Sequence, residues 1–182
     1  MTDAALSYLG ADDLLAALLD RVKEILDADT AAVLLLDSSG RQLIATAASG
    51  LEEEVRQGVR IPVGRGFAGR IAAERRPVIL DHVDHGNVLN PILLEKGIQS
   101  LVGVPLLVHG TVIGVLHAGT VHNQVFASDD AALLQLAADR AALAVQSLRA
   151  REDRAATAAL QRSLLPSALP VIGGVEIAAT DQ

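Results

Sequence analysis

LVGVPLLVHGTVIGVLHAGT, the stretch over residues 101–120, decides the fold of this chain. Two runs of apolar and β-branched residues, 101–108 and 111–120, flank the dipeptide His109–Gly110. Extended runs separated by two such residues predict a β-hairpin. Pro105 lacks an N–H, which predicts an unpaired or bulged position inside the hairpin. The fold should therefore be dominated by antiparallel strand pairing.

The remaining elements follow from the apolar pattern on either side of this hairpin. Apolar residues recur at helical spacing over residues 12–26, which predicts an amphipathic first helix. A second hairpin is expected from strands at 31–36 and 42–48 around Ser38, Ser39 and Gly40. Further along, the pattern predicts a strand at 59–63, a helix at 67–75, an extended segment at 77–80 and a loop at 81–90.

The last element that the sequence predicts clearly is a long Ala-rich helix. Ser128 is a good N-cap, Asp129 and Asp130 suit the positive end of the helix dipole, and Pro166 stops the helix after Leu165. Five residues of this helix follow alternating steps of three and four, the spacing of a helix-pairing seam: Leu134, Ala137, Ala141, Ala144 and Leu148. The alternative is that this face covers the domain's own sheet.

The composition of the chain argues against several classes of function. The chain has 182 residues, a net charge of −7 and no cysteine. The negative charge opposes binding to nucleic acid and to anionic membranes, and the lack of cysteine removes disulfides, thiolate zinc sites and thiol nucleophiles. With no signal peptide and no apolar run of spanning length, we expect a cytoplasmic chain without a membrane segment.

Three stretches of the chain resemble a GAF domain, a small-molecule-sensing relative of the PAS fold. They are IPVGRGFAGRIAAERRPV (61–78), GIQSLVGVPLL (97–107) and GTVIGVLHAGT (110–120). The resemblance covers residues 12–148 and implies an α+β fold with an antiparallel sheet of five to six strands flanked by helices. It also implies a cavity for an unknown small-molecule ligand, with no cofactor required. The pocket candidates are Phe67, His82, His85, Asn90, Ile98 and His117.

A second resemblance concerns LQRSLLPSALPVIGGVEIAA, residues 160–179. It is similar to the junction before the catalytic domain of bacterial PPM-type serine phosphatases related to stage II sporulation protein E. The chain would then comprise a sensor at 12–148, a linker helix at 149–166 and a truncated phosphatase start at 167–182. The phosphatase's acidic metal ligands lie further on in that family, so we expect no catalysis by this chain.

Gly64, Gly66 and Gly69 spell GxGxxG between a strand and a helix, the local pattern of a dinucleotide site. Antiparallel hairpins around it argue against the crossovers that such a site needs. We therefore expect the glycines to permit a tight entry to the helix and its close packing on the sheet, with Phe67 as a buried anchor.

The histidines carry the other candidate chemistry. His82 and His85 lie in the motif DHVDH, which is favoured as a solvated loop, with a metal or haem site as the weaker reading. His117 shares strand parity with Ile113 and Val115 and is predicted to be a neutral, hydrogen-bonded core histidine.

Known GAF chemistries fit less well. The GAF enzymes that reduce free methionine sulfoxide and the bilin-binding photoreceptors use cysteine, which is absent here, and the NKFDE-type signature of cyclic-nucleotide binding is not present.

The functional hypothesis is a sensor that acts as a homodimer through its first and last helices and controls an attached serine phosphatase in sigma-factor partner switching. Two alternatives stay open. One is a haem or redox sensor of a histidine kinase, with His82 or His85 as the ligand. The other is a dimerisation scaffold that binds nothing.

Overall fold

A computed structural model describes residues 10–165 of the chain. The chain divides into two compact units between Gln146 and Ser147. The first unit holds the sheet, the shorter helices and the beginning of the last helix. The helices are α2 (Ala11–Leu26), α3 (Glu52–Arg56), α4 (Gly66–Glu74), α5 (Pro91–Glu95) and α6 (Ser128–Leu164). The strands are β1 (Thr30–Leu36), β2 (Gln42–Ser49), β3 (Arg60–Pro62), β4 (Val78–Leu80), β5 (Ser100–Val108) and β6 (Thr111–Thr120).

One six-stranded sheet with the order β3-β2-β1-β6-β5-β4 forms the centre of the first unit, and every neighbouring pair is antiparallel. This confirms the predicted α+β fold with its antiparallel sheet. The hairpin that decides the fold is present as predicted, because β5 pairs with β6 from Ser100↔Thr120 to Val108↔Thr111. Both turn residues have positive φ, 51° at His109 and 78° at Gly110, as a twist-compatible two-residue turn requires.

An extra residue in β6 changes which face its first residues occupy. Leu106 pairs with Gly114 and Leu107 with Val112, so Ile113 is a bulge. A bulged residue shifts the alternation of side chains by one position. Ile113 therefore packs on the opposite face from Val115, and the prediction that it shares a face with His117 is wrong.

The edge of β5 explains how Pro105 is accommodated. Strand β4 pairs with β5 only between Leu101 and Gly103, so Pro105 lies beyond the last residue that β4 pairs with. The missing N–H of proline costs no ladder bond on that side. This agrees with the unpaired position that the sequence predicts.

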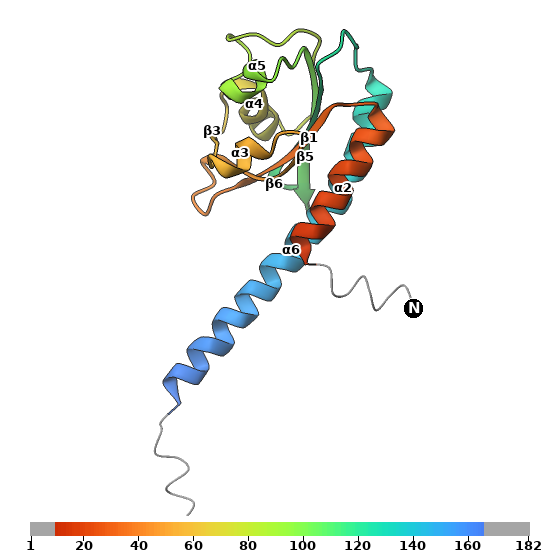
Figure 1. Ribbon diagram of the computed structural model, residues 1–182. Coiled ribbons are helices and arrows are strands. Elements are labelled where there is room, and N and C mark those ends of the chain that lie inside the picture. Colours follow the sequence, from red (N-terminus) through yellow and green to blue (C-terminus); the bar gives the residue numbers. More distant parts are fainter. Residues whose placement is uncertain (1–9, 166–182) are drawn as a thin grey trace, which may run out of the picture. The chain divides into compact units, whose positions relative to one another are not determined.

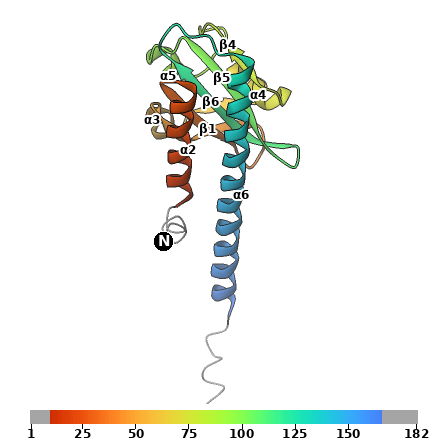
Figure 2. The ribbon, with the colours of Figure 1, turned by 90° about the vertical axis from the view of Figure 1, so that its right-hand side faces the viewer.

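The two faces of the sheet carry separate apolar clusters. The first cluster lies between the sheet and the pair α2 and α6, and includes Leu19, Leu116 and Leu134. The second lies between the sheet and the short helices, with Phe67 and Ile71 of α4 among its members. Figures 1 and 2 show α2 beside the first part of α6 on one face, and α3, α4 and α5 on the other.

The start of α6 differs in detail from the prediction. The carbonyl of Ala127 accepts the first helical hydrogen bond, from the N–H of Ala131 at 3.2 Å, so Ala127 and not Ser128 is the N-cap. The carboxylate of Asp130 accepts the N–H of Ala127 at 2.7 Å. This is half of a capping box, and it places a negative charge in the first turn.

The predicted seam of α6 is partly inside the domain. Leu134 and Ala141 are buried in the first cluster, and Ala137 is half-buried against it. Leucines precede three of the five seam positions and are more exposed than the seam itself. Leu133, Leu136 and Leu143 expose 46%, 63% and 66% of their surface.

The second unit begins within α6. The helix continues without a break from the first unit to Leu164, and its side chains from Arg149 onward are exposed. Residues 149–164 of the predicted linker are helical, and its role as a linker stays a prediction. The predicted phosphatase start at 167–182 lies outside the described residues. No helix within residues 10–165 is both long and apolar enough to cross a lipid bilayer.

Candidate ligand pocket

Two glycines allow α4 to lie against the sheet. A Cβ on Gly69 would lie 2.2 Å from the carbonyl oxygen of Pro62, so only glycine permits this contact between α4 and β3. A Cβ on Gly103 would lie 2.8 Å from Cζ of Phe67. The ring of Phe67 therefore occupies the space over β5 where a side chain would otherwise stand, as the anchor role predicts.

The GxGxxG loop uses its own polar groups. The N–H of Gly64 donates to the carbonyl of Gly69 at 2.7 Å, which closes the loop on itself. Gly66 has a φ of 63° and lies against Leu89, so its positive φ and its contact both favour glycine. These contacts support the structural role of the glycines over a phosphate-binding role.

A cavity of about 20 Å³ lies between the sheet and the short helices, with Glu54, Phe67, Leu89, Asn90 and His117 in its wall. This volume is enough for about one water molecule. The cavity is thus small, but three of the five side chains are polar and, except for Leu89, all are buried.

Glu54, on α3, is fully buried. Its Oε1 accepts a short hydrogen bond from Nδ2 of Asn90, and its Oε2 has no partner among residues 10–165. Burial raises the pKa of this carboxyl from 4.5 to about 7, and the bond from Asn90 offsets the rise only in part. The carboxyl therefore changes its charge close to neutral pH.

Asn90 connects the cavity wall to α5. Its Oδ1 accepts the N–H of Ile92 at 3.1 Å, so Asn90 is the N-cap of this helix, and Pro91 occupies the first helical position. Its Nδ2 faces Glu54. Because both ends of the side-chain amide are bonded, Asn90 holds α3 and α5 together at the cavity.

His117 contributes from the sheet. It lies on β6 opposite Ala32 and Gly103, and its ring meets that of Phe67 edge to face at a centroid distance of 5.9 Å. Burial lowers the pKa of His117 from 6.5 to about 4, so the ring is neutral at physiological pH, as predicted. Its Nδ1 has no hydrogen-bond partner in the described part of the chain, contrary to the predicted satisfied histidine.

The structure brings together three of the six predicted pocket residues: Phe67, Asn90 and His117. Ile98 is buried in the second cluster but does not line the cavity. Glu54 is the site residue that sequence reasoning missed. It follows Glu52 and Glu53, and nothing in three consecutive glutamates indicates which one is buried.

His82 and His85 do not join the pocket, since both are exposed. Between them, Oδ1 of Asp84 accepts the N–H groups of Gly86 and Asn87 at 2.7 and 3.1 Å, the geometry of a local Asx turn. No group of three or more metal-binding side chains occurs among residues 10–165. These contacts support the loop interpretation of DHVDH.

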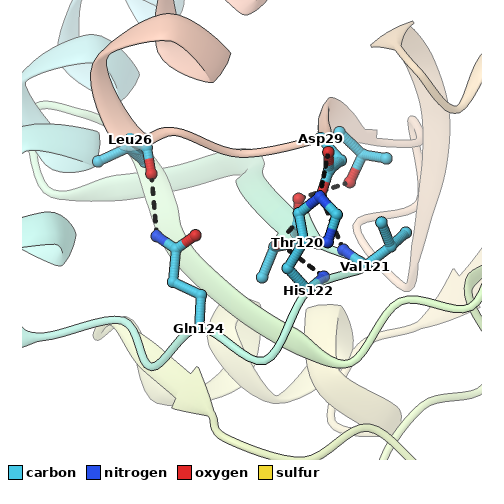
Figure 3. A network of polar contacts seen from close by, with 8 residues as sticks. Leu26, Asp29, Thr120, Val121, His122 and Gln124 are labelled. Atoms are coloured by element: carbon cyan, nitrogen blue, oxygen red, sulfur yellow. Dashed lines mark hydrogen bonds and ion pairs between the residues drawn. The ribbon is translucent and has the colours of Figure 1, made fainter.

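A second polar cluster is structural (Figure 3). One oxygen of Asp29, after α2, accepts the hydroxyl of Thr120 at 2.9 Å and the N–H of Val121 at 2.8 Å. The bond from Val121 is the largest cause that lowers the pKa of Asp29, and the exposed His122 is 3.8 Å from its other oxygen. Nearby, the amide of Gln124 donates to the carbonyl of Leu26. These bonds fix the end of α2 to the end of β6.

The family profile described as GAF domain matches residues 9–146. The chain belongs to the GAF domain family. GAF domains are ligand-sensing regulatory domains that occur in histidine kinases, phosphotransferases and chemotaxis proteins. The family membership confirms the resemblance that the three sequence stretches indicate.

Part of the chain is similar to a transcriptional activator. The HTH-type transcriptional activator RamA of Corynebacterium glutamicum is 36% identical over 84 residues, which are 44% of this chain and 30% of that protein. The chain therefore spans less than a third of that relative's length.

Solved structures agree on the fold. The GAF domain of a phosphoenolpyruvate-protein phosphotransferase from Coxiella burnetii has a TM-score of 0.71 at 21% identity, over 84% of this chain and 92% of that one. A domain of a two-component sensor histidine kinase protein from Sinorhizobium meliloti has a TM-score of 0.60 at 26% identity, over 76% and 92%.

Proposed function

We propose that this GAF domain binds a small molecule in the cavity formed by Glu54, Asn90 and His117, and that occupancy regulates an output domain beyond α6. The observation that carries the proposal is that two lining residues, Glu54 and His117, each hold a buried polar atom, Oε2 and Nδ1, with no hydrogen-bond partner among residues 10–165. A buried polar atom without a partner costs about 1 to 3 kcal/mol. A ligand that bonds to both atoms removes this cost, which is the source of its affinity.

Ligand entry requires a movement at the rim. The cavity of about 20 Å³ admits little more than water, so a larger ligand must displace part of its wall. Leu89 is the exposed member of that wall and rests on Gly66, and the loop that carries it has no strand partner over residues 81–90. In this proposal Leu89 and its loop open toward solvent.

A cavity-filling variant tests the binding proposal. Ala68 lines the cavity, whereas Ala72, one turn later on α4, is equally buried at 7% but lies away from it. A compound library is screened by thermal unfolding, in which a ligand of the native state raises the Tm with concentration. Ala68→Val should abolish the rise and Ala72→Val should keep it. An equal response of the two variants would place the ligand elsewhere.

For the output, we propose an attached PPM-type serine phosphatase of sigma-factor partner switching, acting in the cytoplasm. Support comes from the junction-like sequence LQRSLLP at 160–166 and from the continuity of α6, which runs unbroken from the first unit into the second. A continuous helix transmits a rotation or a shift without a flexible joint, so α6 is the proposed connector.

Deletions in the full-length protein test this connector. Removing three residues from the 150–164 segment turns everything beyond by about 300°, whereas removing seven turns it by about 700°, close to two full turns. Ligand-dependent phosphatase activity should be lost in the first variant and kept in the second. Coupling that survives both deletions equally would contradict transmission through α6, and absence of phosphatase activity in the parent protein would refute the proposed output.

We also propose that the protein is a homodimer through α2 and α6. Leu133, Leu136, Arg140 and Leu143 follow steps of three, four and three on the exposed side of α6, and Ile25 of α2 is exposed beside them. Such a stripe fits a partner helix with the same spacing, which a second copy supplies across a two-fold axis.

Sedimentation velocity tests the dimer. Leu136→Glu should give a monomer, while Val125→Glu, at an exposed site before α6, should leave the dimer intact. A parent protein that sediments as a monomer at tens of micromolar would refute the interface.

A further inference from the structure

The cavity offers a negative charge and lacks a positive one. Its lining residues include no lysine or arginine, and Glu54 and His117 are the only ones that titrate. His117 is neutral because it is completely buried. The charge of an ionised Glu54 is therefore not compensated by any group in the cavity wall.

The hydrogen-bond inventory of the wall is equally one-sided. Each polar side-chain atom of Asn90 makes one hydrogen bond: Nδ2 donates to Glu54, and Oδ1 accepts the N–H of Ile92. One N–H of the amide remains as a further donor. The open positions are Oε2 of Glu54 and Nδ1 of His117. An ionised carboxylate only accepts hydrogen bonds, and the Nδ1 of a neutral histidine accepts when its proton is on Nε2. With Glu54 ionised and the proton of His117 on Nε2, both open positions accept hydrogen bonds, which suits a ligand that donates two of them.

We propose that the pocket of this GAF domain recognises a small aliphatic primary amine in its protonated form, with the ammonium group between Glu54 and His117. An ammonium group has three N–H donors and no acceptor, and it supplies the missing positive charge. Leu34, Phe67 and Val88 are apolar members of the cavity lining, against which the alkyl chain packs once Leu89 has moved aside. This inference rests on the proposed function, because it names the ligand class of the same pocket.

Size and charge favour an ammonium group over the other ligand classes. In a cavity of about 20 Å³ the ammonium group fits where one water would stand, while the alkyl chain extends toward Leu89 at the rim. Anions are repelled by the ionised form of Glu54. A neutral alcohol has only one donor and leaves the buried carboxylate charge unpaired, which is costly.

Binding of an amine is linked to the proton on Glu54. Burial raises the pKa of this carboxyl to about 7 in the free protein, so forming the ion pair releases a proton from part of the molecules at neutral pH. The affinity for the amine should rise about tenfold from pH 6 to pH 8 and level off above, as the ionised fraction does. Titration calorimetry in two buffers of different ionisation enthalpy measures this proton release.

The experiment uses ethylammonium and butylammonium chloride as probes, with 1-propanol and propionate as neutral and anionic counterparts. Binding is followed by NMR shifts of the Phe67 and His117 rings and by calorimetry, for the parent chain, for Glu54→Gln and for Glu53→Gln as the matched control. Glu53 lies on the same helix and pairs with Arg56 at the surface. Far-UV circular dichroism verifies that each variant is folded.

The expected result is saturable binding of an ammonium probe by the parent and by Glu53→Gln, weakened about 30-fold or more by Glu54→Gln. Equal affinity in Glu54→Gln would overturn the proposal. So would a response to propanol or propionate without one to the ammonium probes, although the sensor function would then stand.

If none of the four probes binds, the amine proposal fails. The library screen with Ala68→Val then decides separately whether the pocket binds any ligand.

Discussion

Replacing Glu54 by glutamine should change how the stability of this domain depends on pH. The folded-state pKa of Glu54 is raised from 4.5 to about 7. The unfolded chain therefore gives up this proton at lower pH than the folded chain does. The corresponding stability is complete below pH 4.5 and is lost as pH rises through 7. The difference of the two pKa values corresponds to about 3 kcal/mol.

His117 has the opposite effect. Its folded-state pKa is lowered from 6.5 to about 4, so the unfolded chain takes up this proton first as pH falls. The stability linked to neutral His117 is complete above pH 6.5 and is lost as pH falls through 4, again by about 3 kcal/mol. Between pH 4.5 and 6.5 the contributions of the two groups to the pH dependence of the unfolding free energy cancel. On unfolding in this range, Glu54 releases a proton and His117 takes one up.

In Glu54→Gln, the contribution of His117 to the pH dependence of the unfolding free energy is no longer offset by that of residue 54. The free energy of unfolding of Glu54→Gln should rise by about 3 kcal/mol from pH 4 to pH 6.5, whereas the parent should change little over pH 4.5–6.5 through these two groups. Urea unfolding at half-unit pH steps measures this, with far-UV circular dichroism as the signal because the chain has no tryptophan. Glu53→Gln is the control and should follow the parent.

The refuting result is simple to recognise. If the curves of Glu54→Gln and the parent run parallel from pH 4.5 to 7, Glu54 exchanges no proton on unfolding in that range. The carboxyl would then be hydrated in solution, and the burial of Glu54 on which the ligand proposal depends would be incorrect.

Two further predictions concern the frame around the pocket. Asp29→Ala should cost about 1 to 3 kcal/mol of unfolding free energy at pH 7, because it removes an acceptor bonded to the N–H of Val121, and the loss should shrink as pH falls below 4. His122→Ala, at the exposed partner of the same carboxylate, should change the urea midpoint little. Gly69→Ala should destabilise by about 1 to 3 kcal/mol in thermal unfolding because its Cβ would meet a backbone oxygen, whereas Gly86→Ala should stay within about 0.5 kcal/mol; equal effects of the two alanines would contradict the close packing of α4.

The parts of the fold that sequence predicts well are those with a repeating pattern. The hairpin at 101–120 has alternation, β-branched residues and a two-residue turn, and each signal acts within a few residues of the chain. Two short helices escaped prediction, α3 and α5, since five residues are too few to show a helical period. Asn90 followed by Pro91 is a local start signal for α5 that was available in the sequence.

The pocket shows where sequence reasoning ends. Phe67 and His117 were found because apolar neighbours on an element indicate burial, and Asn90 through the family resemblance. Glu54 is different, because its burial depends on Asn90, 36 residues later in the chain, and on the packing of α3 under the loop before α5. The bulge at Ile113 is likewise a property of the strand pair, so alternation within β6 alone assigned that residue to the wrong face.

Strand β6 connects the wall of the cavity to the apolar cluster beneath α2 and α6. His117 faces the cavity, while Leu116 and Ala118, its immediate neighbours, belong to the cluster beneath α2 and α6. A twist of this one strand that widens the space at His117 must also reposition both neighbours, since they share its backbone. Only one strand separates the cavity from the apolar cluster beneath α2 and α6. A displacement of His117 is therefore transmitted to this cluster through the backbone of β6, without a hinge.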